Sequence, residues 1–430
     1  MREKELEVWF VNFYKLLSRY SMKVAFFLSK FPVSSETFVL NQINGLIALG
    51  VDVNIFALNK GNLNPADPLV SHHDLLNKTT YLLKEGGGDS KYKKIITRLV
   101  SVAKLFVNLQ LVSKLFKARY KNSNKGMVLP VVVSRIKDQL VADIVIAHFG
   151  PIGVFAQNLQ SLGKLEGKIM TVFHGYDISM KSVLEQYQFD YQKLFHESAA
   201  VLPISELWAN KLIGMGCPEN KVFVNRMGIN LTDFNFKQRD TSSPLNLVSV
   251  ARLIEKKGLF DARKARSVLK EAQRDFSYKI IGDGPLEEQL KSYIYDLGLE
   301  DCVDLAGFLP QQQVRQALSE ADIFLLPSIT AENGDMEGIP VALMESMAMG
   351  IITVSTYHSG IPELIANEVS GFLVPERAPK ELANTLINIS QGAFDLETIR
   401  LNASGVIQNK FNQQLLYQEL KTVIENIHGC

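Results

Sequence analysis

Short apolar runs alternate with amphipathic segments along most of the chain. The runs are rich in Val, Ile, Leu and Phe, which is typical of strands buried on both faces of a parallel sheet. The first series of predicted strands is 23–28, 52–58, 143–147, 168–173 and 200–204. The second series is 245–250, 278–281, 303–305, 323–326 and 351–355.

Helical periodicity occurs between these runs, as in the predicted helix 38–49, which ends at Gly50. Strands that alternate with helices imply parallel sheets covered by helices on both faces. Two such series predict an α/β protein with two Rossmann-like, doubly wound domains. Ligands in this architecture bind at the carboxyl ends of the strands, so we expect a cleft there, between the domains.

The pattern also predicts where the units begin and end. A polar stretch, 237–243, reads as a linker between the two series. We expect an amphipathic helical extension at 1–21, an N-terminal domain at 22–236, a C-terminal domain at 245–405, and a last helix at 411–428 that crosses the interface. Residues 1–21 are either native structure or lie upstream of the true start at Met22.

Composition narrows the class of protein. A chain of 430 residues with 47% hydrophobic and 21% charged residues is typical of a globular protein with more than one core. The formal net charge of +1 gives no reason to expect nucleic-acid binding. The three cysteines form no C-x-x-C pair, which fits a reducing cytosol. No uncharged apolar run is long enough to span a membrane, and no signal peptide is recognised.

Two carboxylates, Glu337 and Glu345, flank a predicted helix start. Pro340 suits the first turn of a helix and Gly350 suits the residue after its end, so we expect a helix from Pro340 to Met349. Free N–H groups at its start suit a phosphate. Carboxylates on either side of an anion site suit a ligand with many hydroxyls, such as a nucleotide-sugar. The alternative is an acidic loop followed by a surface helix.

Other polar motifs follow predicted strands. Arg252 and Lys257 precede Gly258, and such a pair can hold a diphosphate or can be a solvated basic turn. The glycine turn at 282–284 either approaches a ligand or is a simple turn. His174 and His148 either face the cleft or are satisfied polar residues.

Together these motifs resemble the retaining glycosyltransferases of the GT-B fold. The pattern is Glu337 and Glu345 preceded by Arg252, Lys257 and the Gly282-Asp-Gly-Pro turn. The resemblance covers nearly everything from Met22 onward. Four segments are similar to the enzymes of colanic-acid and amylovoran exopolysaccharide assembly: 31–42, 147–151, 173–179 and 334–345.

The resemblance implies a role for each matching residue. Arg252 and Lys257 would neutralise the leaving diphosphate, Glu337 would contact the transferred sugar, and His174 would lie beside the reacting carbon. Glu345 would accept hydrogen bonds from the ribose. The remaining donor-binding positions would be Gly282, Gly284, Phe308, Leu309, Gly338, Ile339, Pro340 and Val341.

The implied function is transfer of a hexose from a nucleotide-sugar, with UDP as the expected carrier, to a lipid-linked saccharide acceptor in bacterial exopolysaccharide or capsule synthesis. The N-terminal domain would bind the acceptor and the C-terminal domain the donor. No metal or cofactor is expected, because Arg and Lys replace Mg²⁺ and no Asp-x-Asp motif is present. The alternatives are a nucleotide-sugar epimerase on the same scaffold and a non-catalytic, membrane-associated binding protein.

The sequence departs from the family pattern at two places. Residues 32–36 stand where many relatives have a glycine pair, and the acidic insert 331–336 lengthens the approach to Glu337.

A basic amphipathic stretch suggests contact with a membrane surface. Residues 90–137 hold twelve Lys or Arg and no Asp or Glu, interleaved with apolar positions. Such a stretch, here 91–125, can lie on an anionic leaflet, which would make a cytoplasmic protein peripheral to the inner membrane face. The alternative is an ordinary helix pair with a basic solvent face.

Overall fold

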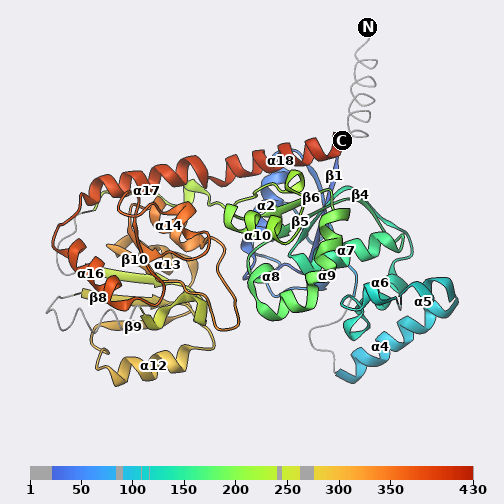
Figure 1. Cartoon of the computed structure of the whole chain (residues 1–430), viewed down its shortest axis with the longest axis horizontal. Helices are drawn as coiled ribbons and strands as arrows, with labels where there is room; N and C mark the ends of the chain where they lie inside the picture. The colour runs from blue at the N-terminus through green and yellow to red at the C-terminus, as the bar shows by residue number, and fades with distance from the viewer. Residues whose placement is uncertain are drawn as a thin grey trace, which may run out of the picture.

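The computed structural model describes residues 22–83, 91–107, 109–115, 117–239, 245–261 and 276–429. Within these ranges the chain forms two lobes, each built on a six-stranded sheet (Figure 1). We call the first sheet with its helices the N-terminal lobe, and the second the C-terminal lobe. The predicted extension 1–21 and residues 240–244 of the linker region lie outside the described residues.

The first sheet is entirely parallel and has the strand order β3-β2-β1-β4-β5-β6. This is the order 3-2-1-4-5-6 of a doubly wound fold, whose topological switch point lies between β1 and β4. Its strands are β1 Lys23–Phe31, β2 Asp52–Lys60, β3 Thr79–Tyr81, β4 Leu140–His148, β5 Leu165–Phe173 and β6 Ala200–Pro203.

The second sheet repeats this topology. Its order is β12-β11-β10-β7-β8-β9, all parallel, with the switch point between β7 and β10. Its strands are β7 Leu245–Val250, β8 Phe276–Ile281, β9 Val303–Gly307, β10 Ile323–Leu326, β11 Ile352–Thr356 and β12 Phe372–Val374. The predicted fold class, two doubly wound sheets, is confirmed. The sequence did not predict β3 and β12, the shortest edge strands.

Helices cover both faces of each sheet. The α-helices of the N-terminal lobe are α2 Thr37–Ala48, α3 Pro68–Ser71, α4 Lys91–Ala103, α5 Leu109–Leu115, α6 Val128–Arg135, α7 Gly150–Ser161, α8 Tyr176–Ser179, α9 Lys181–Glu197 and α10 Glu206–Gly214. Those that follow are α12 Glu287–Asp296, α13 Gln311–Glu320, α14 Val341–Ala348, α15 Ile361–Leu364, α16 Pro379–Ser390, α17 Leu396–Lys410 and α18 Gln413–Gly429. Short 3₁₀ turns are η1 Lys104–Val107, η2 Ala118–Tyr120, η3 Lys125–Met127, η4 Glu219–Lys221, η5 Leu231–Asp233 and η6 Glu255–Lys257.

Each sheet has two apolar cores, one on each face. In β1, Val24 and Phe26 pack into one cluster while Ala25 and Phe27 pack into the other. Alternation of this kind follows from the period of two along a strand, and burial of both sets explains why the strand reads as a continuous apolar run.

The chain crosses between the lobes twice, at neighbouring positions. Near the first crossing Ile229 pairs with Asn412 of the second in an isolated parallel bridge. Helix α17 then lies along the C-terminal lobe, and α18 lies along the N-terminal lobe (Figure 1). Gly45 of α2 makes room for this return, since a Cβ there would lie 2.0 Å from the ring of Tyr417.

Among the described residues, no helix is both long enough and apolar enough to cross a membrane.

Candidate functional site

The switch point of the C-terminal lobe brings together the predicted lysine and the first predicted glutamate. Lys257 lies in η6, after β7, and Glu337 lies in the long loop after β10. Lys257 Nζ is 2.8 Å from Glu337 Oε1. Gly258 allows this approach, because its φ is +63° and a Cβ there would lie 1.8 Å from the carbonyl oxygen of Pro327.

Glu337 is a buried carboxylate that stays ionised. Burial alone would raise its pKa, but the charges of Lys257 and Lys256 and the hydrogen bond from Lys257 outweigh it, so the pKa of Glu337 is lowered. Lys256 is itself buried and lies 3.1 Å from Asp335 Oδ1. The site therefore holds two lysine–carboxylate ion pairs, Lys257 with Glu337 and Lys256 with Asp335.

A histidine–glutamate pair fixes the backbone of Glu337. The Glu337 N–H donates to His358 Nε2 over 3.1 Å, and Ser359 Oγ donates to the Glu337 carbonyl over 2.6 Å. Because Nε2 accepts, the proton of His358 is on Nδ1, which donates to Glu376 Oε1 over 2.6 Å. The second oxygen of Glu376 accepts from the Thr330 N–H at 2.8 Å. Sequence reasoning missed this pair.

Glu345 lies apart from Glu337, on the helix that the sequence predicted. α14 spans Val341–Ala348 with Pro340 at its N-cap, within a residue or two of the predicted bounds. Burial raises the pKa of Glu345 to about 7, which the nearby Arg315 opposes and Asp233 reinforces. The structure thus gives the two glutamates different environments, one ion-paired and one close to half-protonated at neutral pH.

Other predicted donor residues follow the neighbouring strands β7, β8 and β9 of the same sheet. Arg252 is exposed at the end of β7. Gly282 and Gly284 have φ values of +138° and +155°, and Cβ atoms there would lie 1.9 and 2.5 Å from the carbonyl oxygens of Ala251 and Leu253. These glycines therefore let the turn after β8 pack against the Arg252 turn. Phe308, which follows β9, is 75% exposed, so its ring is accessible to a nucleobase.

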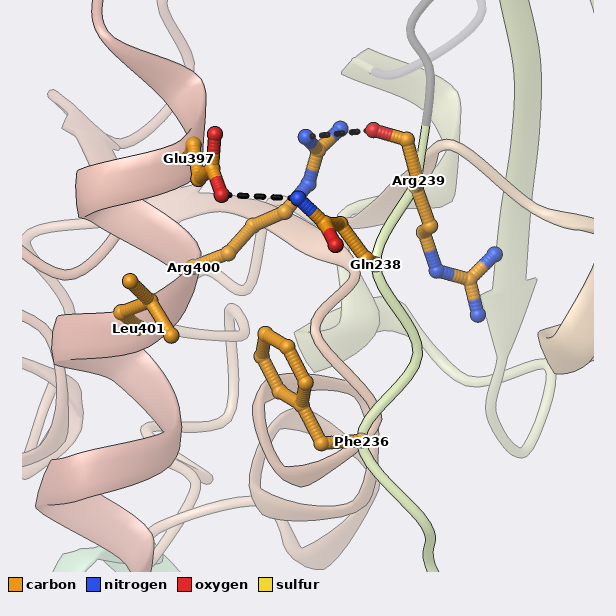
Figure 2. Close-up of a pocket in the computed structure, with 6 residues that line it drawn as sticks. All are labelled: Phe236, Gln238, Arg239, Glu397, Arg400 and Leu401. Carbon is orange, nitrogen blue, oxygen red and sulfur yellow. Dashed lines mark hydrogen bonds between the residues drawn. The ribbon is translucent and has the colours of Figure 1, made fainter.

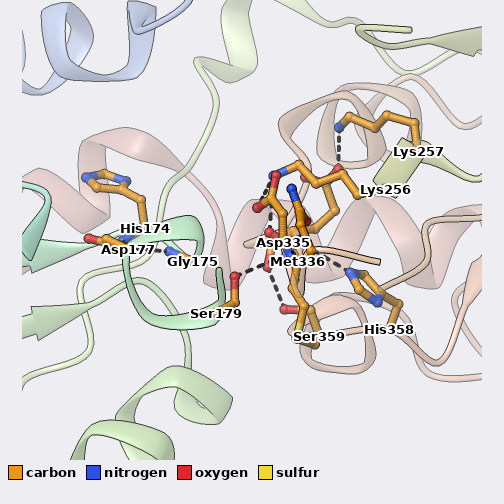
Figure 3. Close-up of polar contacts among 12 residues, drawn as sticks. His174, Gly175, Asp177, Ser179, Lys256, Lys257, Asp335, Met336, His358 and Ser359 are labelled. Carbon is orange, nitrogen blue, oxygen red and sulfur yellow. Dashed lines mark hydrogen bonds and ion pairs between the residues drawn. The ribbon is translucent and has the colours of Figure 1, made fainter. Parts of the chain in front are cut away.

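The acidic insert joins the two lobes next to Glu337. The Lys181 N–H donates to the Asn333 carbonyl over 3.0 Å, and the Met336 N–H donates to Ser179 Oγ over 3.1 Å. Figure 3 shows Ser179, the last residue of α8, beside Asp335 and Met336 of the insert. The insert is therefore an interlobe contact as well as an approach to Glu337.

Two glycines, Gly338 and Gly175, allow a second close approach between the lobes, next to the insert. A Cβ at Gly338 would lie 2.3 Å from Ile204 Cδ1 and 3.2 Å from the His174 carbonyl oxygen, and one at Gly175 would lie 3.3 Å from the Glu337 carbonyl oxygen. The backbones of His174 and Glu337 are thus neighbours across the lobes. The predicted segment 338–341 begins at this contact.

Partly buried His174 is linked by a hydrogen-bonded chain to the buried side chains of His148 and Gln42. His148 Nδ1 is 2.9 Å from His174 Nε2, and His148 Nε2 is 3.0 Å from Gln42 Oε1. With the Gln42 oxygen accepting, His148 Nε2 carries the proton and His148 Nδ1 accepts from His174. Burial lowers the pKa of His148 to about 3 and, together with His148, keeps the pKa of His174 well below its usual value. Both imidazoles are neutral at physiological pH.

A small cavity of about 130 Å³ lies elsewhere, between α17 and the segment 236–239. Figure 2 shows Gln238 hydrogen-bonded to Glu397, and Arg400 to the Arg239 carbonyl. The residues that line it include none of the predicted site positions, and its polar contacts tie the interlobe segment to α17. We assign it no ligand.

The chain is similar in sequence and in fold to known proteins. The family profile of the glycosyl transferases group 1 matches residues 232–403. Amylovoran biosynthesis glycosyltransferase AmsK of Erwinia amylovora is 46% identical over 407 residues, 94% of this chain and 100% of the relative. WcaL of Escherichia coli K12, a glycosyltransferase named for colanic acid biosynthesis, is 44% identical with 94% and 100% coverage.

Solved structures show the same fold. Anabaena HepE in complex with UDP-glucose has a TM-score of 0.65 and 17% identity, covering 94% of this chain and 100% of that one. A sucrose-phosphate synthase from Thermosynechococcus elongatus has a TM-score of 0.67 and 15% identity, covering 95% and 99%. The chain is 46% and 44% identical to AmsK and WcaL over their whole lengths and has the GT-B architecture. It therefore belongs to the group 1 glycosyltransferase family.

Proposed function

We propose that this glycosyltransferase moves a hexose from a UDP-sugar to a saccharide hydroxyl with retention of anomeric configuration. The observation that carries the proposal is the Lys257–Glu337 pair, 2.8 Å apart at the switch point of the C-terminal lobe and in contact with the N-terminal lobe. A switch point is where open α/β sheets bind ligands. Lysine there suits a diphosphate, and a carboxylate suits sugar hydroxyls.

The transfer step breaks the bond between the anomeric carbon and the β-phosphate oxygen and forms one to the acceptor oxygen. The acceptor's proton goes to an oxygen of the departing UDP on the same face of the sugar. Lys257 and Arg252 stabilise the negative charge that develops on the diphosphate. Glu337 is ion-paired and its backbone is held by His358, so it serves better as a hydroxyl-binding group than as a covalent nucleophile.

The biological setting is also a proposal. AmsK and WcaL are named for amylovoran and colanic acid biosynthesis, and both align along their whole length. We infer that this chain acts in bacterial exopolysaccharide assembly on a lipid-linked saccharide, at the cytoplasmic face of the membrane. Residues 22–236 would form the acceptor half, residues 245–405 the donor half, and α18 the interface helix. The absence of a metal requirement stays a prediction.

The test is a screen of nucleotide-hexoses by thermal shift, followed by an assay of nucleotide release with and without acceptor extract. A ligand that binds the native state raises the melting temperature according to its affinity. Stabilisation by UDP-hexoses and acceptor-dependent UDP release would support the proposal. Conversion of the donor sugar without acceptor would instead identify an epimerase, and no release with any donor would identify a non-catalytic binder.

Donor affinity is expected to depend on the ionisation of Glu345, whose pKa is about 7. An ionised carboxylate accepts two ribose hydrogen bonds, so affinity should rise up to about tenfold between pH 6 and 8.

The stability of the folded protein should change with pH in the opposite direction. Because the pKa is raised in the folded state, the contribution of this group is present below the unfolded pKa and is lost as pH rises through 7. Calorimetric titration with UDP at several pH values measures the affinity. Glu345→Gln should remove the pH dependence of both the affinity and the stability.

We also propose that residues 91–125 contact an anionic lipid surface. α4 and α5 leave large apolar side chains in solvent, including Tyr92 at 81% and Leu109 at 70% exposure. The same stretch is basic and has no acidic residue. Apolar side chains that insert below lipid headgroups, beside lysines that attract them, form an interfacial anchor.

Flotation with phosphatidylglycerol vesicles should recover the protein at low salt and lose it at high salt. Ile96→Asp or Leu109→Asp should weaken partitioning about tenfold or more, since each replaces an exposed apolar side chain that would insert below the headgroups with a charged one. Tyr295→Asp, at a 74% exposed position of α12 in the other lobe, is the matched control. If the protein fails to float at low salt, or all three variants behave alike, the surface is not a membrane anchor.

A further inference from the structure

A carboxylate of the C-terminal lobe caps a helix of the N-terminal lobe. Glu363 lies in α15, after β11, and its side chain is only 19% exposed. The N–H groups of Glu206 and Leu207, the first two residues of α10, donate to its Oε2 and Oε1 atoms, each over 3.0 Å. N–H groups at such positions have no partner within their own helix, and the helix dipole favours a negative charge beside them. Glu363 therefore completes from one lobe the hydrogen bonding of a helix in the other.

An arginine joins this contact to the place where the chain changes lobes. Arg226 Nη2 donates to Glu363 Oε2 over 3.2 Å and to Glu206 Oε1 over 3.0 Å. Arg226 precedes by three positions Ile229, whose bridge to Asn412 marks the two crossings between the lobes. The side chain of Arg226 is 27% exposed, so the pair is partly screened from solvent. The contact is thus an ionic link between the lobes, close to their covalent connections.

The segment that carries Glu363 also holds the backbone of Glu337. His358 accepts from the Glu337 N–H, and Ser359 Oγ donates to the Glu337 carbonyl. The Ile361 N–H donates to the His358 carbonyl over 3.0 Å, which ties this part of the segment to α15. Ile361 is fully buried in the same apolar cluster as Ile339, which lies two positions after Glu337. Residues 358–363 therefore connect α10 of one lobe with Glu337 of the other through buried, hydrogen-bonded contacts.

Close packing leaves this segment little freedom between its two partners. A Cβ on Gly360 would lie 2.8 Å from Ile339 Cγ1 and 3.2 Å from Ser205 Cβ. Ser205 is the N-cap residue of α10, and its Oγ accepts from the Trp208 N–H. The start of α10 and the loop after Glu337 are thus packed against opposite sides of one residue, so a displacement of either is transmitted to the other.

We propose that Glu363 is a positioning residue for sugar transfer, which holds α10 and the N-terminal lobe in register with Glu337. The two substrates are held by different lobes in the proposed function, and an error of about 1 Å in their alignment can cost about 10²-fold in rate. Glu363 itself touches neither substrate. This inference rests on the proposed function and names the residue that aligns the two halves of its site.

The first measurement separates alignment from donor binding. Glu363→Ala should lower kcat about 10- to 100-fold, because the lobes lose their register. The Kd for UDP should stay near that of the wild type, since Lys257 and Glu345 are untouched. Glu363→Gln keeps one acceptor oxygen for α10 and should transfer at an intermediate rate, and it carries the test if the alanine variant does not fold. Initial rates of transfer and calorimetric titration with UDP give the two quantities.

The second measurement follows the link itself by amide hydrogen exchange on the whole protein, without substrate. In Glu363→Ala the N–H groups of Glu206 and Leu207 lose their acceptor, and those of Met336 and Glu337 lose the support of the aligned lobes. Both pairs should exchange about 2- to 10-fold faster, as for the loss of one hydrogen bond. Ser205→Ala is the matched control, because it removes a cap of the same helix from within its own lobe. Exchange should then rise in α10 alone, with kcat unchanged.

Four results would overturn the inference. They are a wild-type kcat in Glu363→Ala, a loss of UDP affinity in proportion to kcat, wild-type exchange at Met336 and Glu337, and an equal fall of kcat in Ser205→Ala. The last would show that damage to α10 alone slows transfer. If the wild type transfers sugar from no donor, the proposed function fails, and the exchange data still decide whether Glu363 links the lobes.

Discussion

Lys257→Ala is expected to lower the rate of sugar transfer by about 10²–10³-fold, as for the loss of one preorganised group at a developing negative charge. Lys257 is fixed by Gly258 behind it and by its ion pair with Glu337, so its charge needs no rearrangement when the diphosphate leaves. Exposed Arg252 would retain part of the effect. Initial rates of UDP release measure the loss.

The same change should destabilise the fold, and this must be separated from the effect on the rate. Removing one partner of a buried pair leaves an unpaired charge and costs about 3–5 kcal/mol, and the side chains of Lys257 and Glu337 are only 13% and 9% exposed. The double variant Lys257→Ala/Glu337→Gln should regain most of that stability while transfer stays slow. Lys279→Ala, which breaks an exposed pair with Asp304, should leave both quantities nearly unchanged. Near-normal transfer by Lys257→Ala would remove Lys257 from the mechanism.

Glu376→Ala is expected to lower kcat by an order of 10²-fold, because a displacement of about 1 Å at a positioned group can have that cost. Glu376 does not reach the sugar in this proposal. It accepts the Nδ1 proton of His358, and the opposite nitrogen of that ring holds the Glu337 backbone. Without Glu376 the tautomer is no longer fixed, and a proton on Nε2 would repel the Glu337 N–H.

Kinetics can separate positioning from general damage. If Glu376 orients Glu337, kcat should fall while the affinity for UDP alone stays near that of the wild type, since Glu337 contacts the sugar. Glu376→Gln, whose side-chain oxygen can still accept the His358 proton, should restore most of the rate. The free energy of unfolding of the alanine variant should fall by about 1–3 kcal/mol, because the buried Nδ1–H of His358 loses its acceptor. Equal loss of kcat and UDP affinity, or no rescue by glutamine, would show that the pair is merely structural. Glu300→Ala, at an exposed position, is the control.

The fold was largely predictable because buried parallel strands read as continuous apolar runs. The ten predicted strands are all present, and helices α14 and α18 begin within a few residues of their predicted positions. The two missed strands, β3 and β12, are three residues long. Such a segment is too short for its period to be seen against the surrounding loop, and only its neighbour in the sheet makes it a strand.

The candidate site was predictable in part, for a physical reason. Strand ends meet at one edge of a parallel sheet, so Lys257 and Glu337 could be expected to approach each other although 80 positions separate them along the chain. The hydrogen bonds by which His358 and Glu376 hold the Glu337 backbone could not be predicted. Both residues follow other strands, and neither belongs to a recognisable motif. Lys256 was also missed, since nothing in the sequence distinguishes the buried lysine beside Asp335 from its neighbour.

Helix α18 has a consequence for how the chain is made. Leu420 and Ile424 belong to the same core as Val24 and Phe26 of β1, and Lys421 Nζ binds the Leu49 carbonyl from 372 positions away. During synthesis the N-terminal lobe emerges first, but this core stays open along α2 until the whole C-terminal lobe has been translated. The C-terminal sheet, by contrast, is contiguous in sequence. The lobe that leaves the ribosome first is therefore completed last, and until then the apolar positions that α18 will cover stay open to solvent and to chaperones.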